Sequence, residues 1–213
     1  MSRAPEGPLP AERFAEILTG RAPVFRVDLG DDVRSSLSAY LAELDRWRRQ
    51  TNLTGQLSPD ELVDHALEAV LAVPLISPGE RVVDIGSGAG FPGIPLTIAL
   101  PAAEFVLVEP RGRRAAFLRH VVRALAIANA SVIEARIENV GGQTFEVAVT
   151  RAVGGFSAWI GEAAFLSPGG RFLAWTTDSD VVAAGLGPAF RFSKQVPLPA
   201  SVSRRIAVFV KAS

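Results

Sequence analysis

The amino-acid sequence predicts an α/β protein with a mostly parallel, doubly wound sheet, an N-terminal helical extension and a C-terminal antiparallel hairpin. In the first part of the chain, apolar residues recur at helical spacing. From Arg81 onward, short β-rich apolar runs alternate with helical patterns, and two strand-like runs follow each other near the end. Strands that are apolar on both faces and separated by helices are typical of parallel sheets. We therefore expect a helical extension over residues 1–78 and a sheet-containing core over residues 79–213.

The extension is expected to hold three helices. A short one is predicted around Glu12 to Leu18, within a segment rich in Pro, Gly and charge. A longer amphipathic helix is predicted from Asp32, and the sequence NLTG ends it. The third is expected to begin at SPDE and to run to about Val73. There Ser58 is a suitable N-cap, and the next residues supply Pro at the first helical position and complete a capping box.

The core is expected to begin with the strand RVVDI and to alternate from there. Further strands are predicted in the runs EFVLVE, ASVIEA, FEVAVT and GRFLAW. The helical patterns between them are GIPLTIAL, RRAAFLRHVVRAL, RIENV and SAWIGEAAFL, and LSPGG is expected as a turn before the last of these strands. The runs AFRFSKQVPL and RRIAVFVKA are expected to pair as a hairpin at the sheet edge.

The composition excludes several classes of protein. The 213 residues are 48% hydrophobic, which is enough for a buried core. Lys and Arg number 22, as do Asp and Glu, so net charge gives no case for nucleic acid, although a local basic patch is compatible with it. With no Cys, the chain has no disulfide, thiolate metal site or cysteine nucleophile, which fits a reducing cytosol. Signal-peptide and membrane-spanning patterns are absent, and we expect a soluble protein of the cytoplasm.

The segment RVVDIGSGAGFPGIPL places four glycines soon after an acid in the first strand, Asp84. A glycine-rich turn after this strand lies at the edge of the sheet where ligands bind. A tight turn without a ligand is the alternative, but these glycines exceed what one turn requires. A P-loop is rejected, because Ile94 and Pro95 stand where it needs Lys and Ser or Thr. GAGFPG matches the dinucleotide pattern, yet the match begins two residues too far from the strand. The Asp84 carboxylate beside a pyrophosphate would also be unfavourable.

The pattern D-x-G-x-G-x-G resolves this conflict and favours S-adenosylmethionine as the ligand. Its sulfonium and ammonium groups suit Asp84, and it has no pyrophosphate. Gly86 and Gly88 would let the backbone lie close to the sugar. Further contacts are expected from an acid that ends the second strand and binds ribose, and from an apolar residue and an acid that hold adenine after the third: Glu109, Ile137 and Glu138.

The methyl acceptor is narrowed by exclusion. Methylation of pyrimidine C5 normally uses a Cys nucleophile, which is missing. The [DNS]-P-P-[YFW] motif common in methylation of exocyclic amines is replaced by Thr150, Arg151 and Ala152. Neither His65 nor His120 has partners at metal spacing, so no metal is expected. An acceptor that is already nucleophilic remains, such as guanine N7, and catalysis would then be positioning, with Arg151 as the candidate side chain.

Several motifs occur in the order and spacing of a known family: NLTG, a His in the next helix, VVDIGSGAGFPGIPLTIALP, RGRRAAFL and TRAV. From Tyr40 to Trp175 the chain resembles the glucose-inhibited division protein B family, which are small-subunit rRNA guanine-N7 methyltransferases. The resemblance implies a Rossmann-like class I methyltransferase core with a helical extension over its cofactor edge. It also implies cofactor contacts at these positions: Gly86, Phe91, Ile137, Glu138 and Arg151.

The sequence departs from this family on the acceptor side. Asp64 stands before His65 where the family usually has Arg, Glu68 and Ala69 replace an Asp-Ser pair, and Thr176 stands in the region of a usual Lys. Two alternatives therefore stay open. One is a methyltransferase for a small molecule or a protein, and the other is a non-catalytic S-adenosylmethionine-binding regulator.

RNA contacts are expected from basic and polar residues near the cofactor edge. The guanidinium group suits phosphate, although a solvated helix face, a helix stop and a packing role are the ordinary interpretations of such residues. The candidates are Asn52, His65, Arg111, Arg113 and Arg114. The expected partner is small-subunit rRNA or a ribosomal particle. We expect the protein to be a monomer and to bind no membrane.

Overall fold

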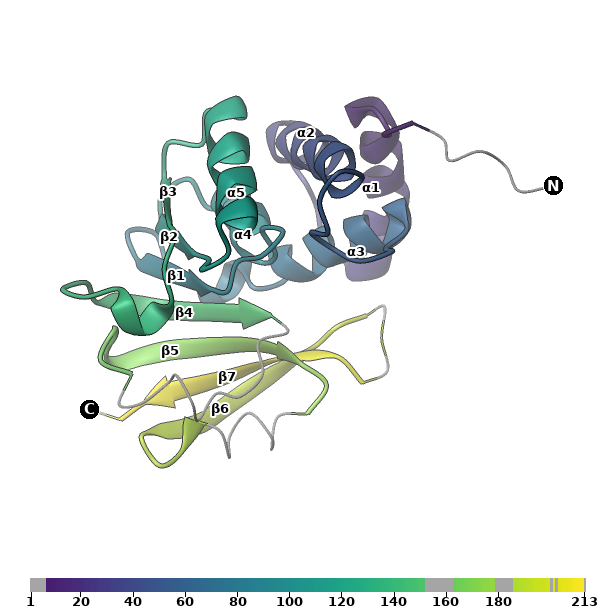
Figure 1. Ribbon diagram of the computed structural model, residues 1–213. Coiled ribbons are helices and arrows are strands. Elements are labelled where there is room, and N and C mark those ends of the chain that lie inside the picture. Colours follow the sequence, from purple (N-terminus) through teal and green to yellow (C-terminus); the bar gives the residue numbers. More distant parts are fainter. Residues whose placement is uncertain (1–6, 152–162, 179–185, 200, 202, 213) are drawn as a thin grey trace.

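The computed structural model describes residues 7–151, 163–178, 186–199, 201 and 203–212. Within them, one sheet of seven strands has the order β3-β2-β1-β4-β5-β7-β6, with helices packed beside it (Figure 1). The strands are β1 Arg81–Ile85, β2 Glu104–Val108, β3 Ala130–Ile133, β4 Phe145–Arg151, β5 Leu166–Thr176, β6 Phe190–Pro197 and β7 Arg205–Lys211. The helices are α1 Ala11–Phe25, α2 Asp31–Arg48, α3 Pro59–Val70, α4 Gly93–Ala99 and α5 Gly112–Ala124, with short 3-10 turns at Val73–Leu75 and Ile137–Asn139.

The strand directions confirm the predicted fold class. β1 pairs in parallel with both β2 and β4, and β5 is parallel to β4. β7 is antiparallel to β5 and to β6, so the hairpin closes one edge of the sheet. The chain leaves β1 in one direction toward β2 and β3, and reaches β4 on the other side. This reversal creates a crevice at the carboxyl ends of β1 and β4, where ligands bind in such sheets.

The helices of the extension differ from expectation mainly in length. α1 continues to Phe25, beyond the predicted end, because Ala22 and Phe25 are buried and extend its apolar face. α3 begins as predicted, with the Ser58 side chain accepting from the Glu61 N–H in a complete capping box. It ends at Val70, and a separate 3-10 turn follows where the helix was expected to continue.

Two predicted elements of the core are different, and a third lies partly outside the described residues. RIENV forms only the 3-10 turn at Ile137–Asn139. LSPGG is part of β5, where Leu166 pairs with Phe145 and Arg171 pairs with Val147, so a bulge absorbs the expected turn. The helical pattern SAWIGEAAFL spans residues 157–166. Residues 157–162 lie outside those that the structure describes, and residues 163–166 form a turn that enters β5 instead of a helix.

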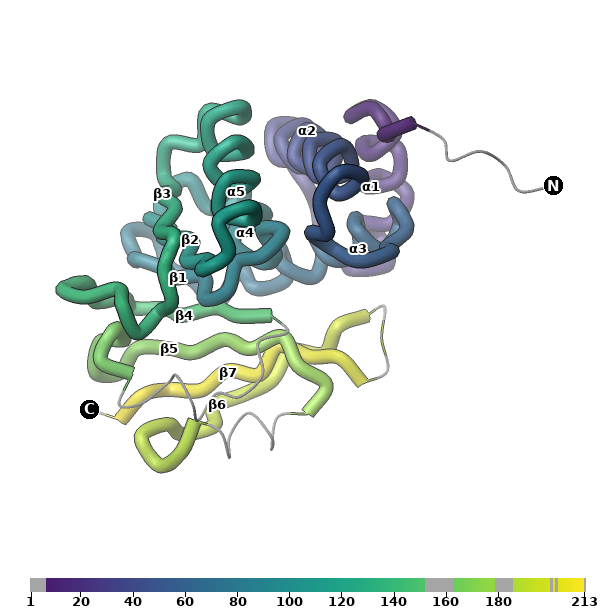
Figure 2. The backbone as a smooth tube through the Cα atoms, in the orientation of Figure 1, coloured from purple at the N-terminus to yellow at the C-terminus, as the bar shows by residue number. Residues whose placement is uncertain are grey.

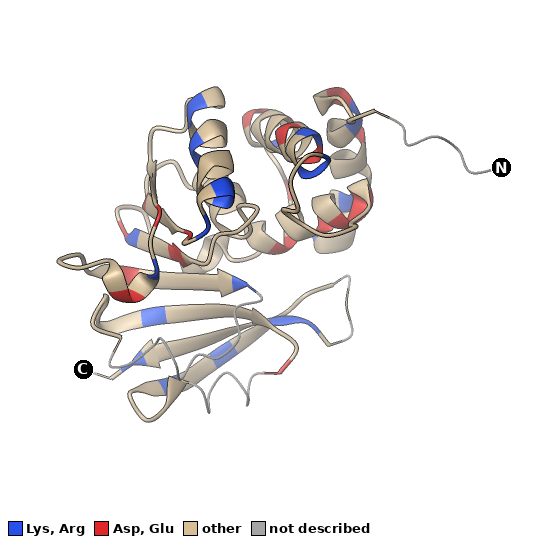
Figure 3. Cartoon of the chain, in the orientation of Figure 1, with Lys and Arg blue, Asp and Glu red and all other residues tan. Residues whose placement is uncertain are grey.

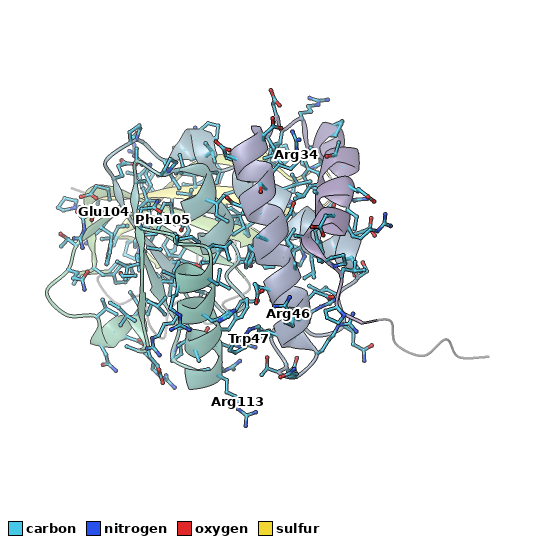
Figure 4. All side chains as sticks on the ribbon, turned by 90° about the horizontal axis from the view of Figure 1, so that it is seen from above. Arg34, Arg46, Trp47, Glu104, Phe105 and Arg113 are labelled. Atoms are coloured by element: carbon cyan, nitrogen blue, oxygen red, sulfur yellow. The ribbon has the colours of Figure 1, made fainter. Side chains whose placement is uncertain are left out.

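The extension packs directly on the core. One apolar cluster joins buried residues of α1, α2 and α3 with Phe91, Ile94 and Phe117. Trp47 of α2 lies between α2 and α5, with its ring 5.5 Å from that of Phe117 (Figure 4). The tube in Figure 2 shows α1 to α3 grouped beside α4 and α5. The boundary at residue 78 stays a prediction, and this shared cluster means that the extension does not pack as a separate body.

No helix within the described ranges is both long and apolar enough to span a membrane.

Candidate functional site

The loop between β1 and α4 is held in place by backbone hydrogen bonds. Gly86 and Ser87 both donate their N–H groups to the Val108 carbonyl at the end of β2. Gly86 and Gly88 have φ values of 72° and 57°, which glycine adopts without strain. The Gly88 N–H donates to Oε2 of Glu109, and the Arg111 N–H donates to Oε1, both at 2.9 Å. The Glu109 carboxylate therefore joins the loops that follow β1 and β2.

Asp84 lies beneath this loop rather than on its open side. It shares a strand face with Val82, and its Oδ2 accepts a hydrogen bond from the Gly93 N–H at 3.2 Å. A side chain on Gly93 would collide with that oxygen. Oδ1 has no hydrogen-bond partner among the described atoms, and burial raises the pKa of the carboxyl to about 7. Strand alternation turns the Asp84 side chain under α4, in a supporting position, and its contact with a ligand stays a prediction.

A cavity of about 470 Å³ opens above the loop, at the carboxyl ends of β1, β2 and β4. Eight residues proposed from the sequence line it: Gly86, Gly88, Phe91, Glu109, Arg151, His65, Arg111 and Arg114. Six other residues line it: Leu53, Thr54, Leu57, Ser87, Ala89 and Pro110. A functional role or a helix stop was open for Thr54 from the sequence, and the other five were missed. The first three come from the segment between α2 and α3, so the extension supplies one wall. The motif NLTG was the available signal for that wall.

The remaining proposed residues lie elsewhere. Ile137 is buried in an apolar cluster with Val83 and Val108, and Glu138 is exposed. Neither lines the cavity, so their contact with a ligand stays a prediction. Asn52 and Arg113 line a neighbouring cavity of about 360 Å³, which the first cavity meets at shared residues. Those shared residues are Leu53, Arg111 and Arg114.

Aromatic contacts connect the extension to the loop. The Tyr40 hydroxyl donates to the Ala89 carbonyl at 2.8 Å. The Phe91 ring stacks edge-on against both Tyr40 and His65, with centroids 5.5 and 5.6 Å apart. Burial lowers the pKa of His65 to about 3, and the nearby charges of Arg151 and a further arginine, Arg204, lower it too. His65 is therefore neutral at physiological pH.

Arg151 reaches the cavity from the end of β4. Its Nη1 donates to Oε2 of Glu68 at 2.9 Å, and the Glu68 side chain is fully buried. A second guanidinium, that of Arg204, also pairs with this carboxylate at 2.9 Å. Sequence reasoning named Glu68 only as a departure from the family on the acceptor side, and it missed Arg204. The available signal was an acid between apolar residues of α3, since a buried carboxylate requires a cation.

Arginines recur along α5, and no acid interrupts them (Figure 3). Arg119 pairs with Glu134 at 2.9 Å. Within the described part of the chain, the side chains of Arg111, Arg113 and Arg114 at the start of the helix have no ion pair. Figure 4 shows Arg113 extending away from the body of the protein. These three cations are therefore available to an anion.

The chemistry of the cavity suits a ligand that has a sugar and carries positive charge. The loop offers backbone without side chains at Gly86 and Gly88, and the Glu109 carboxylate stands beside it. A carboxylate at this place can accept hydrogen bonds from ribose hydroxyls and attracts positive charge. In the described ranges, no three His, Asp or Glu side chains are grouped as metal ligands would be; the expectation that no metal takes part stays a prediction.

Comparisons with known proteins match this chain to one family of methyltransferases. The model of the family described as rRNA small subunit methyltransferase G matches residues 33–182. A relative of that name from Myxococcus xanthus is 31% identical over 212 residues, which cover 93% of this chain and 98% of the relative. Another of that name, from Salmonella arizonae, is 36% identical over 152 residues, covering 70% of this chain and 72% of the relative.

Solved structures share the fold at low sequence identity. A mutant of MtNAS in complex with S-adenosylmethionine has a TM-score of 0.62 at 18% identity, covering 95% of this chain and 97% of that one. The ribosomal protein L11 methylase from Lactobacillus delbrueckii subsp. bulgaricus has a TM-score of 0.59 at 11% identity, covering 71% of this chain and 80% of that one. These similarities concern the fold alone.

Proposed function

Because this chain belongs to the rRNA small subunit methyltransferase G family, we propose that it transfers the methyl group of S-adenosylmethionine to N7 of a guanosine in small-subunit rRNA. When bound, S-adenosylmethionine would supply a methyl group on a sulfonium, with the neutral thioether of S-adenosylhomocysteine as the leaving group. The protein must then hold two reactants in register and keep water out, which is catalysis by positioning.

The observation that carries the choice of acceptor is the state of His65. It lines the cavity, and its pKa of about 3 makes it a weak proton acceptor at neutral pH. Asp84 has a pKa of about 7, but its side chain lies beneath the loop, away from the cavity wall. An acceptor that must lose a proton before it attacks needs a general base, and neither His65 nor Asp84 is suited to that role here. Guanine N7 has an in-plane lone pair and needs no base.

We assign cofactor binding to the loop wall. The cavity is lined by Gly86, Gly88, Glu109 and Phe91. The two glycines would lie against the sugar, Glu109 would accept from ribose hydroxyls, and Phe91 would cover the ligand on the side that faces the extension. Asp84 acts indirectly by fixing the start of α4 through Gly93. The family resemblance supports adenine contacts from Ile137 and Glu138.

We assign RNA binding to the neighbouring basic cavity. Asn52 and three arginines line it: Arg111, Arg113 and Arg114. Their side chains suit the phosphates that flank a guanosine placed in the main cavity, and such contacts give affinity without choice of base. The partner is small-subunit rRNA or a precursor particle, and we propose that the protein acts on it as a monomer in the cytoplasm.

Analysis of ribonucleosides from a strain that lacks this gene tests the function. We expect 7-methylguanosine to disappear from small-subunit RNA and to return when the parent protein is supplied. Glu109→Ala should restore it poorly at matched protein levels. Unchanged 7-methylguanosine in the deletion strain would contradict the proposal, and a methylated small molecule or protein missing instead would favour that alternative.

A further inference from the structure

Glu68 is a buried carboxylate shared by two arginines from distant parts of the chain. Its Oε2 accepts from Arg151 at 2.9 Å and from Arg204 at 3.3 Å. The Arg204 Nη2 also lies 2.9 Å from Oε1. The Glu68 side chain is fully buried, whereas 14% of the Arg151 side chain and 32% of the Arg204 side chain are exposed. The two guanidiniums thus compete for one carboxylate at the edge of the cavity.

The segment before β7 is built to place Arg204 at this point. The Arg204 N–H donates to Oγ of Ser201 at 3.1 Å, and its carbonyl accepts from the Leu198 N–H at 3.0 Å. On the other side, the Trp175 indole of β5 donates to the Glu68 carbonyl at 3.2 Å. Strand β5, helix α3 and the segment before β7 are therefore tied together around the carboxylate.

Glu68 is the one carboxylate that both guanidiniums contact. Glu61 is a second acid that acts on Arg204 through its charge alone, and His65 beside them is neutral. Burial lowers the pKa of Arg151, Glu68 opposes that shift, and the Arg204 charge adds to it by repulsion. If Arg151 were the sole partner of Glu68, any movement away would leave a buried carboxylate unpaired, which is costly. With Arg204 present, the carboxylate keeps a partner when Arg151 moves.

We propose that Arg204 is a positioning residue for methyl transfer: it keeps the Glu68 charge paired, so that the Arg151 guanidinium can turn toward the acceptor base in the cavity. This inference rests on the proposed function, because it gives Arg151 a partner in the acceptor. Arg204 acts through Glu68 and Arg151 and does not itself line the cavity.

A set of charge variants tests it, with methyl transfer to small-subunit particles as the assay. Arg204→Gln should lower kcat/KM for the particle about tenfold, a coupling usual for one ion-pair network, with little change in cofactor affinity. Arg204→Lys should restore most of the loss. The double variant Arg204→Gln with Glu68→Gln should also recover, because a neutral side chain no longer holds Arg151. Arg191→Gln, at the far end of the same hairpin, makes the same charge change and should match the parent.

A purely structural role and a positioning role differ in what Arg204→Gln changes. If Arg204 only stabilised the fold, Arg204→Gln would lower the free energy of unfolding and the cofactor affinity together with the rate. That joint loss would overturn the inference, as would a double variant no better than Arg204→Gln or parental activity of Arg204→Gln itself.

A measurement without substrate separates this inference from the proposed function. In nitrogen NMR of arginine side chains, with Arg151 assigned through Arg151→Lys, rotation of the Arg151 guanidinium should be slower in Arg204→Gln than in the parent. Unchanged rotation would overturn the inference. Slower rotation in a protein that transfers no methyl group to particles would support the Glu68 network while the proposed substrate fails.

Discussion

One wall of the cavity is made largely of backbone, whereas the opposite wall is made of side chains that meet from distant parts of the sequence. The loop wall needs a few consecutive residues, fixed by Glu109 and by the end of β2. The opposite wall, which we propose faces the acceptor and call the acceptor wall, joins α3, β4 and the segment before α3. Behind it Glu68 pairs with Arg204, 136 residues away in the sequence. A continuous motif can therefore specify how a cofactor is held, while the choice of acceptor depends on tertiary structure. The two walls should also fail differently when they are changed.

The support of the loop wall should depend on pH, and this is the largest effect that we expect. Burial raises the pKa of Asp84 from 3.8 to about 7. Between these values the folded state keeps a proton that the unfolded state has lost, so the free energy of unfolding falls as pH rises and levels off above about pH 7. The contribution is about 4 kcal/mol at most. Urea unfolding across this range should show a smaller decline for Asp84→Asn. The same pH dependence in both proteins would mean that Asp84 is ionised in the fold.

Changes to the acceptor wall should lower the rate of methyl transfer more than the affinity for the cofactor. Arg151→Ala should lower kcat/KM for the particle about a hundredfold, the order expected when reactants lose their alignment. Cofactor affinity, measured by calorimetry, should change far less. Arg151→Lys keeps the charge of the Glu68 pair and serves as the control for folding. A mutant whose rate loss is matched by an equal loss of cofactor affinity would remove the distinction between the walls.

The loop wall itself should fail through affinity. Glu109→Ala should weaken S-adenosylmethionine binding by about 1–3 kcal/mol, because a carboxylate that receives hydrogen bonds is lost. Glu134→Ala removes a surface acid of the same type and is the matched control. Calorimetry that shows a preference for NAD over S-adenosylmethionine would contradict this account of the wall.

The basic cavity should contribute affinity that depends on salt. Arg113→Ala with Arg114→Ala should reduce the salt dependence of RNA binding by roughly 0.7–0.9 per lost phosphate contact. Arg119→Ala with Arg123→Ala removes the same charge farther along α5 and should have less effect. If both pairs change the slope equally, the start of α5 is no special phosphate site.

His65 should have the smallest effect on pH dependence. The single-turnover rate should be nearly flat above about pH 6, since neutral guanine N7 is already unprotonated. His65→Gln should leave that profile flat, whatever its effect on the absolute rate. A steep rise near neutral pH that disappears in His65→Gln would make His65 a general base.

The sequence allowed the fold class to be predicted. Parallel pairing and the C-terminal hairpin follow from apolar periodicity and the alternation of strands with helices, and Gly86 and Gly88 of the glycine motif line the cavity. The buried position of Asp84 was also predictable from the sequence, because residues 82 and 84 share a strand face and α4 covers that face. The prediction instead followed from the charge of Asp84 within the cofactor pattern.

Other parts of the site could not be predicted from local patterns. The bulge in β5 depends on pairing with β4, so LSPGG looked like a turn. The Glu68 network depends on which residue of the segment before β7 arrives at α3, and neither periodicity nor a motif encodes this. An acid within an apolar helix face indicates that a cation is needed, but it does not identify Arg151 and Arg204 as its partners.

The central claim is most directly tested by methyl transfer from labelled S-adenosylmethionine to small-subunit particles that lack the modification, followed by mass analysis of the ribonucleosides. We predict label in 7-methylguanosine with the parent protein and a strong reduction with Arg151→Ala. Label in another nucleoside, or no transfer by a parent protein that binds the cofactor, would contradict the account.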